Sequence, residues 1–222
     1  MSIILNIFNK GFQIFDYINL SILAIFIPTF FFVSITPGMC MTLSLSMGMS
    51  IGIKRTFFMM YGELLGVGLV ATSSVIGVAT IMLAYPTIFV ILKYCGGAYL
   101  IYLGISMWLS RGKMALNLES SSFNVSNKSL AIQGFITAIA NPKGWAFFIA
   151  LLPPFIDKNL AFVPQLSVLI LLILLLEFSC LIIYASGGST LRKLLQNSSN
   201  VKLLNKIAGT MMIGIGIWLA LT

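Results

Sequence analysis

Two glutamates inside long apolar segments are the first candidates for chemistry in this sequence. Glu63 lies eight residues after Arg55 and Glu177 lies ten residues after Ser167, so both fall near the middle of a membrane-length stretch. An ionised carboxylate at that depth costs about 3 kcal/mol, and loss of water favours its protonated form. A carboxyl that is protonated when occluded and ionised when wet is suited to proton coupling. The alternative is a neutral acid hydrogen-bonded to a neighbouring helix.

Lys143 is a cation in the middle of another apolar segment. Its ammonium group is suited to binding a substrate carboxylate, or to balancing the charge of Glu63 or Glu177. The plainer alternative is snorkelling, in which the long side chain carries its charge towards the membrane surface. Because Lys143 directly follows a proline, we favour a functional role.

Two proline motifs interrupt apolar segments at matching places in the two halves of the chain: Thr36-Pro37-Gly38 and Asn141-Pro142-Lys143-Gly144. Proline inside a helix removes a backbone donor and costs about 3 kcal/mol. In a bilayer the freed polar groups are tolerated only where protein or a water-filled cavity satisfies them. Matched breaks favour a solute site over kinks that serve packing alone. The predicted substrate-binding residues are Thr36, Pro37, Gly38, Asn141, Pro142 and Lys143.

The composition excludes a soluble domain. Hydrophobic residues make up 59% of the chain, charged residues only 8%, and the mean hydropathy is +1.05, whereas soluble proteins are about 25% charged. The net charge of +8 does not indicate a nucleic-acid partner, because the basic residues lie between apolar segments. The chain has no histidine, the usual metal ligand, and its three cysteines read as small core residues. We therefore expect no metal site.

The apolar segments predict an all-α membrane protein with six transmembrane helices. Residues 17–53 carry no charge, and one straight helix of that length would be about 55 Å long, against a hydrocarbon core of about 30 Å. The break at Pro37 resolves this conflict. The predicted spans are about 18–36 (continuing, bent, to about 48), 57–82, 88–109, 130–152, 165–186 and 203–221.

The six spans divide into two halves. We expect an interfacial amphipathic segment at 1–16, followed by one transporter domain over 17–222. A polar loop at about 111–129 separates a first repeat, about 17–110, from a second, about 130–222. Because each half holds three spans, the halves enter the membrane from opposite sides. The sequence therefore predicts an inverted repeat in which helices 1 and 4 are broken by proline.

The basic residues predict the orientation. Loops after spans one, three and five carry Lys54, Arg55, Arg111, Lys113, Lys128, Arg192, Lys193 and Lys202. The other side carries Lys10, Lys93 and Lys158. This imbalance puts the odd-numbered loops in the cytoplasm and both termini outside.

Small residues predict where helices approach closely. Gly62 and Gly66 form a GxxxG pattern, and Gly97 and Gly104 lie on one helix face. These glycines do not reveal whether the chain forms a homo-oligomer, which stays an open alternative.

Several of these motifs together resemble the LysE/RhtB family of amino-acid exporters, over nearly the whole chain from residue 18. The motifs are Thr36-Pro37-Gly38, Gly62-Glu63, Lys93 to Gly104 with its Gly-Ala-Tyr-Leu-x-Tyr-Leu-Gly element, Asn141-Pro142-Lys143 followed by Phe147-Phe148 and Leu152-Pro153, and Leu204 to Gly209 leading to Gly214-Ile215-Gly216. Met39 departs from the family pattern, which usually has a second proline there.

The resemblance implies a bacterial inner-membrane protein with six helices and no organic cofactor. It also implies export of an amino acid or a derivative in exchange for protons, with Glu63 and Glu177 as the proton-coupling candidates. Three rival functions stay open. The first is efflux of a cation or metal ion, which the missing histidine disfavours. The second is an intramembrane enzyme, which lacks a recognisable histidine–acid–nucleophile set. The third is a membrane partner subunit that transports nothing itself.

Overall fold

The computed structural model describes residues 20–110, 126–157 and 160–221. Within these ranges every regular element is a helix, as the sequence predicts. The elements are α2 (Leu20–Ile35), α3 (Met39–Ile51), α4 (Ile53–Ala84), α5 (Pro86–Leu109), α6 (Asn127–Ile139), α7 (Pro142–Leu151), the short η2 (Pro153–Phe155), α8 (Phe162–Gln196) and α9 (Ser198–Leu221). The predicted segment 1–16 and most of the predicted loop 111–129 lie outside the described residues.

Both proline motifs break their helices, which confirms the predicted interruptions. α2 and α3 meet at Pro37 with a bend of 58°. In the second half, α6 ends at Ile139 and α7 begins at Pro142, in the first helical turn where proline is tolerated. Each of these apolar segments is therefore a pair of short helices.

The fifth predicted span ends where the structure ends its membrane-length stretch, Phe162–Gly188. The sequence ends the span at 186, before Gly187-Gly188, and α8 kinks there before it continues to Gln196. Gly188 has φ 45° and ψ −134°, a conformation that glycine adopts at little cost, so the chain kinks there and the helix resumes. Gly52, with φ 78°, plays a similar part between α3 and α4.

Apolar helices identify a membrane protein. Among the described residues, two helical stretches are long and apolar enough to cross a membrane: Ile53–Val78 in α4 and Phe162–Gly188 in α8. The bent pair Ile22–Ile35 and Met39–Ile51 raises this number to three if it counts as one span. The count of six spans stays a prediction.

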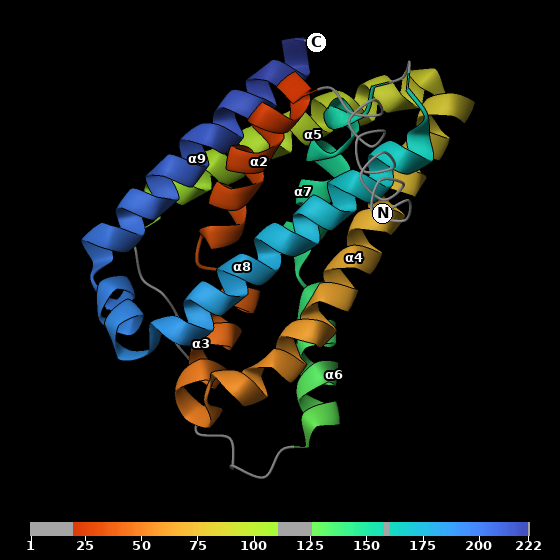
Figure 1. Cartoon of the computed structure of the whole chain (residues 1–222). Helices are drawn as coiled ribbons and strands as arrows, with labels where there is room; N and C mark the ends of the chain where they lie inside the picture. Colours follow the sequence, from red (N-terminus) through yellow and green to blue (C-terminus); the bar gives the residue numbers. More distant parts are fainter. Residues whose placement is uncertain (1–19, 111–125, 158–159, 222) are drawn as a thin grey trace, which may run out of the picture.

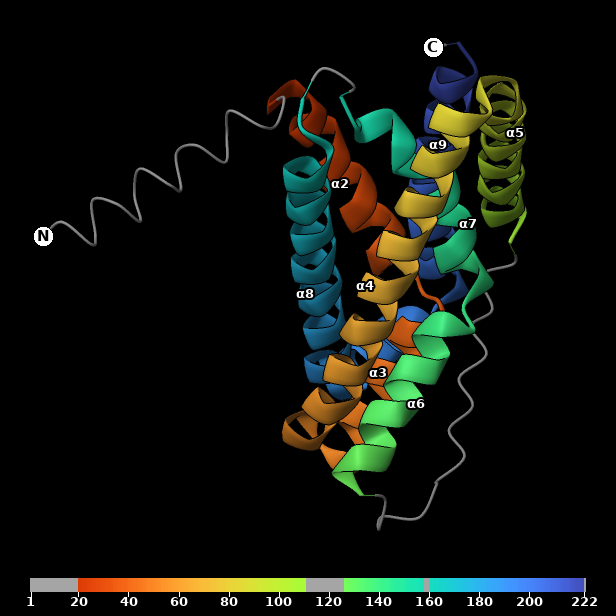
Figure 2. The same cartoon turned by 90° about the vertical axis from the view of Figure 1, so that its right-hand side faces the viewer.

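The long helices α4 and α8 each pack against several other helices. α4 packs against α6, α7 and α8, while α8 also packs against α2 and α3 (Figure 1). α5 and α9 lie against each other on one side of the bundle, as Figure 2 shows. This arrangement brings the two helix breaks to the middle of the molecule, next to α4 and α8.

Glycines allow three of the helix pairs to touch backbone to backbone: α4 with α6, α5 with α9, and α3 with α8, where a Cβ atom on Gly48 would collide with the Ala185 carbonyl oxygen. A Cβ atom on Gly62 of α4 would collide with the carbonyl oxygen of Ala131, and one on Gly134 of α6 would collide with that of Met59. Close approach at Gly62 and Gly66 is therefore confirmed, and Gly97 and Gly104 make the corresponding approach between α5 and α9.

Substitution of Gly134 by alanine tests this packing. We expect Gly134→Ala to lower the free energy of unfolding by about 1–3 kcal/mol or more, because α4 and α6 must separate to admit the methyl group. Thermal unfolding of the purified protein in detergent measures the change.

Gly77→Ala is the matched control on α4. A Cβ atom at Gly77 would meet nothing within 4 Å among the described residues, and alanine favours a helix by up to about 1 kcal/mol over glycine. Equal stability of the two variants would contradict the close approach of α4 and α6.

Candidate functional site

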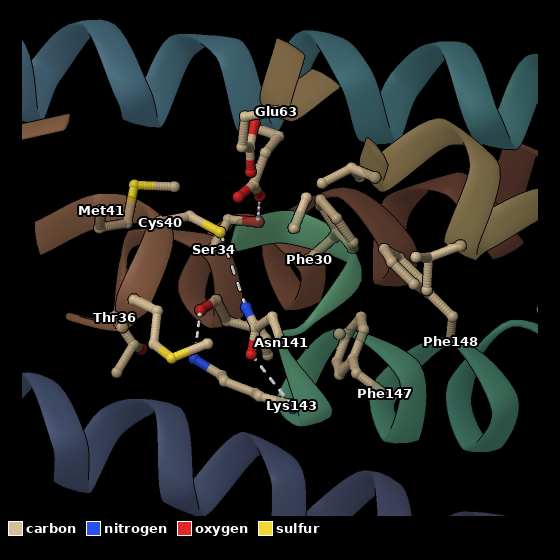
Figure 3. A pocket seen from close by; sticks show the side chains of 18 residues that line it. Phe30, Ser34, Thr36, Cys40, Met41, Glu63, Asn141, Lys143, Phe147 and Phe148 are labelled. Carbon is tan, nitrogen blue, oxygen red and sulfur yellow. Dashed lines mark hydrogen bonds between the residues drawn. The ribbon is translucent and has the colours of Figure 1, made fainter. Parts of the chain in front are cut away.

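The two helix breaks border a common cavity. Its volume is about 60 Å³, several times the ~10–15 Å³ that one water needs. Figure 3 shows Ser34 and Thr36 from the first break and Asn141 and Lys143 from the second pointing into the same region, with Phe30, Phe147 and Phe148 to one side. The cavity is therefore polar at the breaks and apolar beyond them.

Most of the predicted site residues come together here. The predicted residues that line the cavity are Thr36, Gly38, Glu63, Asn141, Lys143 and Glu177. Pro37 and Pro142 make the breaks but do not themselves line the cavity. Met39, the departure from the family pattern, begins α3 and also lines the cavity.

Two of the carbonyl groups that the first break frees receive side-chain donors. In an unbroken helix the Val33 carbonyl would accept from residue 37, but proline has no N–H. The ammonium group of Lys143 donates to it instead, over 3.2 Å. The Ile35 carbonyl would accept from residue 39 and instead accepts from the Tyr184 hydroxyl of α8, over 2.7 Å.

At the second break, the freed backbone groups find hydrogen-bond partners within residues 139–145. Asn141 precedes α7, and its Oδ1 accepts from the backbone N–H of Lys143 over 3.1 Å, as a helix cap does. This leaves the Ile139 carbonyl without its helical partner. The indole N–H of Trp145 donates to that carbonyl over 2.8 Å.

Glu177 is held by the opposite half of the chain. Its side chain is buried in α8, and the Ser34 hydroxyl of α2 donates to Oε2 over 2.5 Å. The ammonium group of Lys143 interacts electrostatically with this carboxylate. Glu177 therefore has one hydrogen-bond donor and one nearby cation in its buried position.

Glu63 has a different environment. Its side chain is 0% exposed, and neither carboxylate oxygen has a hydrogen-bond partner among the described residues. Glu63 nevertheless interacts with the Glu177 carboxyl and with the neighbouring Cys40 thiol, each close enough for a weak hydrogen bond. The Cys40 sulfur also accepts from the Asn141 amide over 3.7 Å. A buried carboxyl without a partner is costly, so a proton or a bound cation is expected to complete it.

Comparison with known proteins gives the family. The family model described as LysE type translocator matches residues 31–222, which include both breaks and both buried glutamates. This chain belongs to the LysE type translocator family. The family resemblance found from the sequence motifs is thereby confirmed.

Three relatives of this LysE family member cover nearly all of it. An uncharacterized membrane protein of Vibrio cholerae is 27% identical over 84% of this chain and 90% of its own length. The homoserine/homoserine lactone efflux protein of Salmonella typhimurium is 26% identical over 84% of this chain and 90% of its own length. The leucine efflux protein of Klebsiella pneumoniae is 26% identical over 85% of this chain and 90% of its own length. No solved structure matches.

Sequence reasoning missed four polar contributors: Ser34, Tyr184, Cys40 and Trp145. Ser34 lies two residues before Thr36, close enough to the break to be suspected. Tyr184 follows Glu177 by seven residues, which puts both on one face of α8, so that spacing is a usable signal. Cys40 was assigned to the core, and nothing in the sequence indicates its contact with Asn141.

The donor from Tyr184 can be removed with little change in shape. We expect Tyr184→Phe to lower the free energy of unfolding by about 1–3 kcal/mol, because the Ile35 carbonyl would be left buried without a partner. Chemical or thermal unfolding in detergent measures the loss. Tyr102→Phe is the control, since the Tyr102 side chain is 63% exposed. Equal losses in both variants would contradict the role of Tyr184 at the break.

Proposed function

We propose that this LysE family member is a secondary transporter that exports an amino acid or an amino-acid derivative from the cytoplasm. The observation that carries the proposal is the convergence of both proline breaks and both buried glutamates on one cavity. Solute sites of many transporters lie at such breaks near the bilayer midplane. The efflux proteins of Salmonella and Klebsiella, which this chain resembles over most of its length, support the substrate class.

We further propose that the two halves are inverted repeats of about 17–110 and 130–222. Glycines in α5 and α9 support this symmetry. Gly97 and Gly104 are seven residues apart, as are Gly209 and Gly216. A Cβ atom on Gly104 would lie 2.6 Å from the Gly209 carbonyl oxygen, and one on Gly216 would lie 2.7 Å from that of Gly97. Such reciprocal contacts are expected when a two-fold axis exchanges two antiparallel helices. The same axis would exchange α4 with α8, and Glu63 with Glu177.

We propose a bacterial inner-membrane location with the odd-numbered loops in the cytoplasm. The α3–α4 junction, the start of α6 and the kink of α8 lie at one end of the bundle, opposite the start of α2 (Figure 2). The exposed lysines near the first end support this orientation: they are Lys54, Lys128, Lys193 and Lys202. Positively charged loops favour the cytoplasmic side.

For the transport cycle we propose proton antiport through Glu63 and Glu177. Protonation of a carboxyl in the cavity removes a charge from apolar surroundings and would shift the balance between inward- and outward-facing states. The bond from Lys143 to Val33 favours charge balance over direct substrate binding for that lysine. Lys143 would thus keep the pair of glutamates from carrying two uncompensated charges.

Proton movement in acid-loaded inverted vesicles tests the function. When single amino acids are added outside, we expect one or more to make protons leave the lumen, seen as recovery of a pH-sensitive dye. Glu63→Gln should reduce this recovery at least about tenfold, because the carboxyl that binds the proton is gone.

Glu119→Gln is the matched control, as it makes the same change in the stretch that the sequence predicts to be a polar loop. We expect it to transport like the parent protein. If no amino acid moves protons or is itself carried by folded protein, the exporter assignment is wrong. If amino acids are carried without protons, only the antiport is wrong.

Labelling with a membrane-impermeant thiol reagent tests the orientation. Ala161 and Lys128 are exposed near opposite ends of the bundle. We expect Ala161→Cys to be labelled in intact cells, and Lys128→Cys only after the cells are opened. The parent protein supplies the background from its own cysteines. The reverse pattern would invert the proposed topology.

A further inference from the structure

We infer that the solute is recognised by its ammonium group, which binds the Glu63 carboxylate, and that proton and ammonium group compete for this one carboxyl. The inference rests on the proposed export function and deepens it. It assigns the ammonium group, which all amino acids share, to Glu63. It also explains why export of the solute would be coupled to import of a proton.

The incomplete hydrogen bonding of Glu63 is the main observation. Both of its oxygens are buried in the wall of the cavity and make no hydrogen bond of ordinary geometry among the described residues, although the Cys40 thiol and the Glu177 carboxyl interact with them. An ionised carboxylate accepts several hydrogen bonds, and an ammonium group supplies up to three donors together with the opposite charge. Glu63 therefore offers what an amine-bearing solute needs.

The other polar groups of the cavity already have partners. Ser34 donates to Glu177, and Lys143 donates to the Val33 carbonyl. Asn141 caps α7 through its oxygen and contacts Cys40 through its nitrogen. A solute carboxylate at Lys143 would meet the negative charge of Glu177 beside it. Recognition centred on the carboxylate is therefore disfavoured relative to recognition centred on the ammonium group.

The remaining wall suits an uncharged part of the solute. Phe30, Phe147, Phe148, Val67 and Val70 line the cavity and are buried. These side chains offer apolar surface and no hydrogen bonds to a charged group. We therefore expect the solute to place its ammonium group at Glu63 and an apolar side chain against the phenylalanines.

Competition at Glu63 would give an obligatory exchange. The carboxyl is neutralised either by a proton or by an ammonium group, and the empty carboxylate is the costly state in apolar surroundings. When solute binds from the cytoplasm, the proton leaves Glu63 to cytoplasmic water. When solute leaves outside, a proton from that side takes its place. One solute then moves out for each proton that moves in.

Several elements determine how the charge of Glu63 responds to pH. Glu177 of α8 and Cys40 of α3 interact with it directly, and α6 places Gly134 against its backbone. Ser34 of α2 and Lys143 of α7 line the same cavity. Glu177 is countered by Ser34 and Lys143. Solute affinity should therefore fall as pH decreases, approaching tenfold per pH unit once a single carboxyl is being protonated.

Substrate analogues test the inference on the unmodified protein. In proteoliposomes that hold the full chain, export of labelled leucine is measured with leucinamide or 4-methylpentanoate as competitor. Leucinamide keeps the ammonium group and lacks the carboxylate, and 4-methylpentanoate has the reverse. We expect leucinamide to compete within about tenfold of leucine itself, and 4-methylpentanoate to be at least about tenfold weaker than leucinamide. Competition by 4-methylpentanoate equal to or better than that by leucinamide would overturn the inference.

Net charge movement supplies a second readout. Exchange of zwitterionic leucine for one proton moves one positive charge, whereas exchange of the leucinamide cation for one proton moves none. We expect a valinomycin-imposed membrane potential to accelerate leucine export and to leave leucinamide export unchanged. The same response for both solutes would contradict competition between proton and ammonium group.

The outcomes separate the inference from the function on which it rests. If another amino acid of the panel is exported in place of leucine, its own amide and deaminated acid are the probes, with the same expectations. If an amino acid is exported but its deaminated acid competes better than its amide, the function stands and the role of Glu63 is wrong. If no amino acid is exported, both are wrong.

Discussion

The need to satisfy freed backbone carbonyls in apolar surroundings governs the centre of this protein. Each proline takes away one N–H and bends the chain, and a carbonyl left buried without a partner costs a few kcal/mol. Lys143, Tyr184 and Trp145 supply the missing donors. These long polar side chains are in the interior because the broken backbone requires them there.

Hydrogen bonds around the breaks also connect the two halves of the chain. Lys143 reaches from α7 to α2, Ser34 reaches from α2 to α8, and Tyr184 reaches from α8 to the end of α2. A movement of the helices around the cavity against one another must therefore exchange donors there. The cavity also holds the carboxyls that would bind a proton or a solute. Binding there would therefore affect the same hydrogen bonds that must change when the helices move.

The sequence predicts the breaks and the buried acids well. Proline inside a helix and a carboxylate inside the membrane each cost about 3 kcal/mol, so their positions indicate structure without knowledge of the fold. Proline within an apolar segment and a carboxyl at mid-span are visible without any tertiary information, and both come together as expected. The end of the fifth span at Gly187-Gly188 is also predicted, whereas the helical turns that follow Gly188 are less predictable, since a glycine allows a kink as readily as an end. The contacts of Tyr184 and Cys40 depend on how the helices pack. Helical periodicity indicates which face of a helix is buried, but not which residue of another helix it contacts.

Packing and hydrogen bonding divide the molecule into two kinds of interface. At the glycine contacts of α4 with α6, and of α5 with α9, backbones touch directly, so separation or sliding would lose contacts that no side chain can replace. At the breaks, side-chain donors have rotatable bonds and can change partners. We therefore expect the glycine-packed pairs to move as rigid units and the breaks to act as hinges. Gly134 of α6 packs against the Glu63 backbone of α4. During a transport cycle, a change in the charge of Glu63 would therefore act on the α4–α6 pair as one rigid unit.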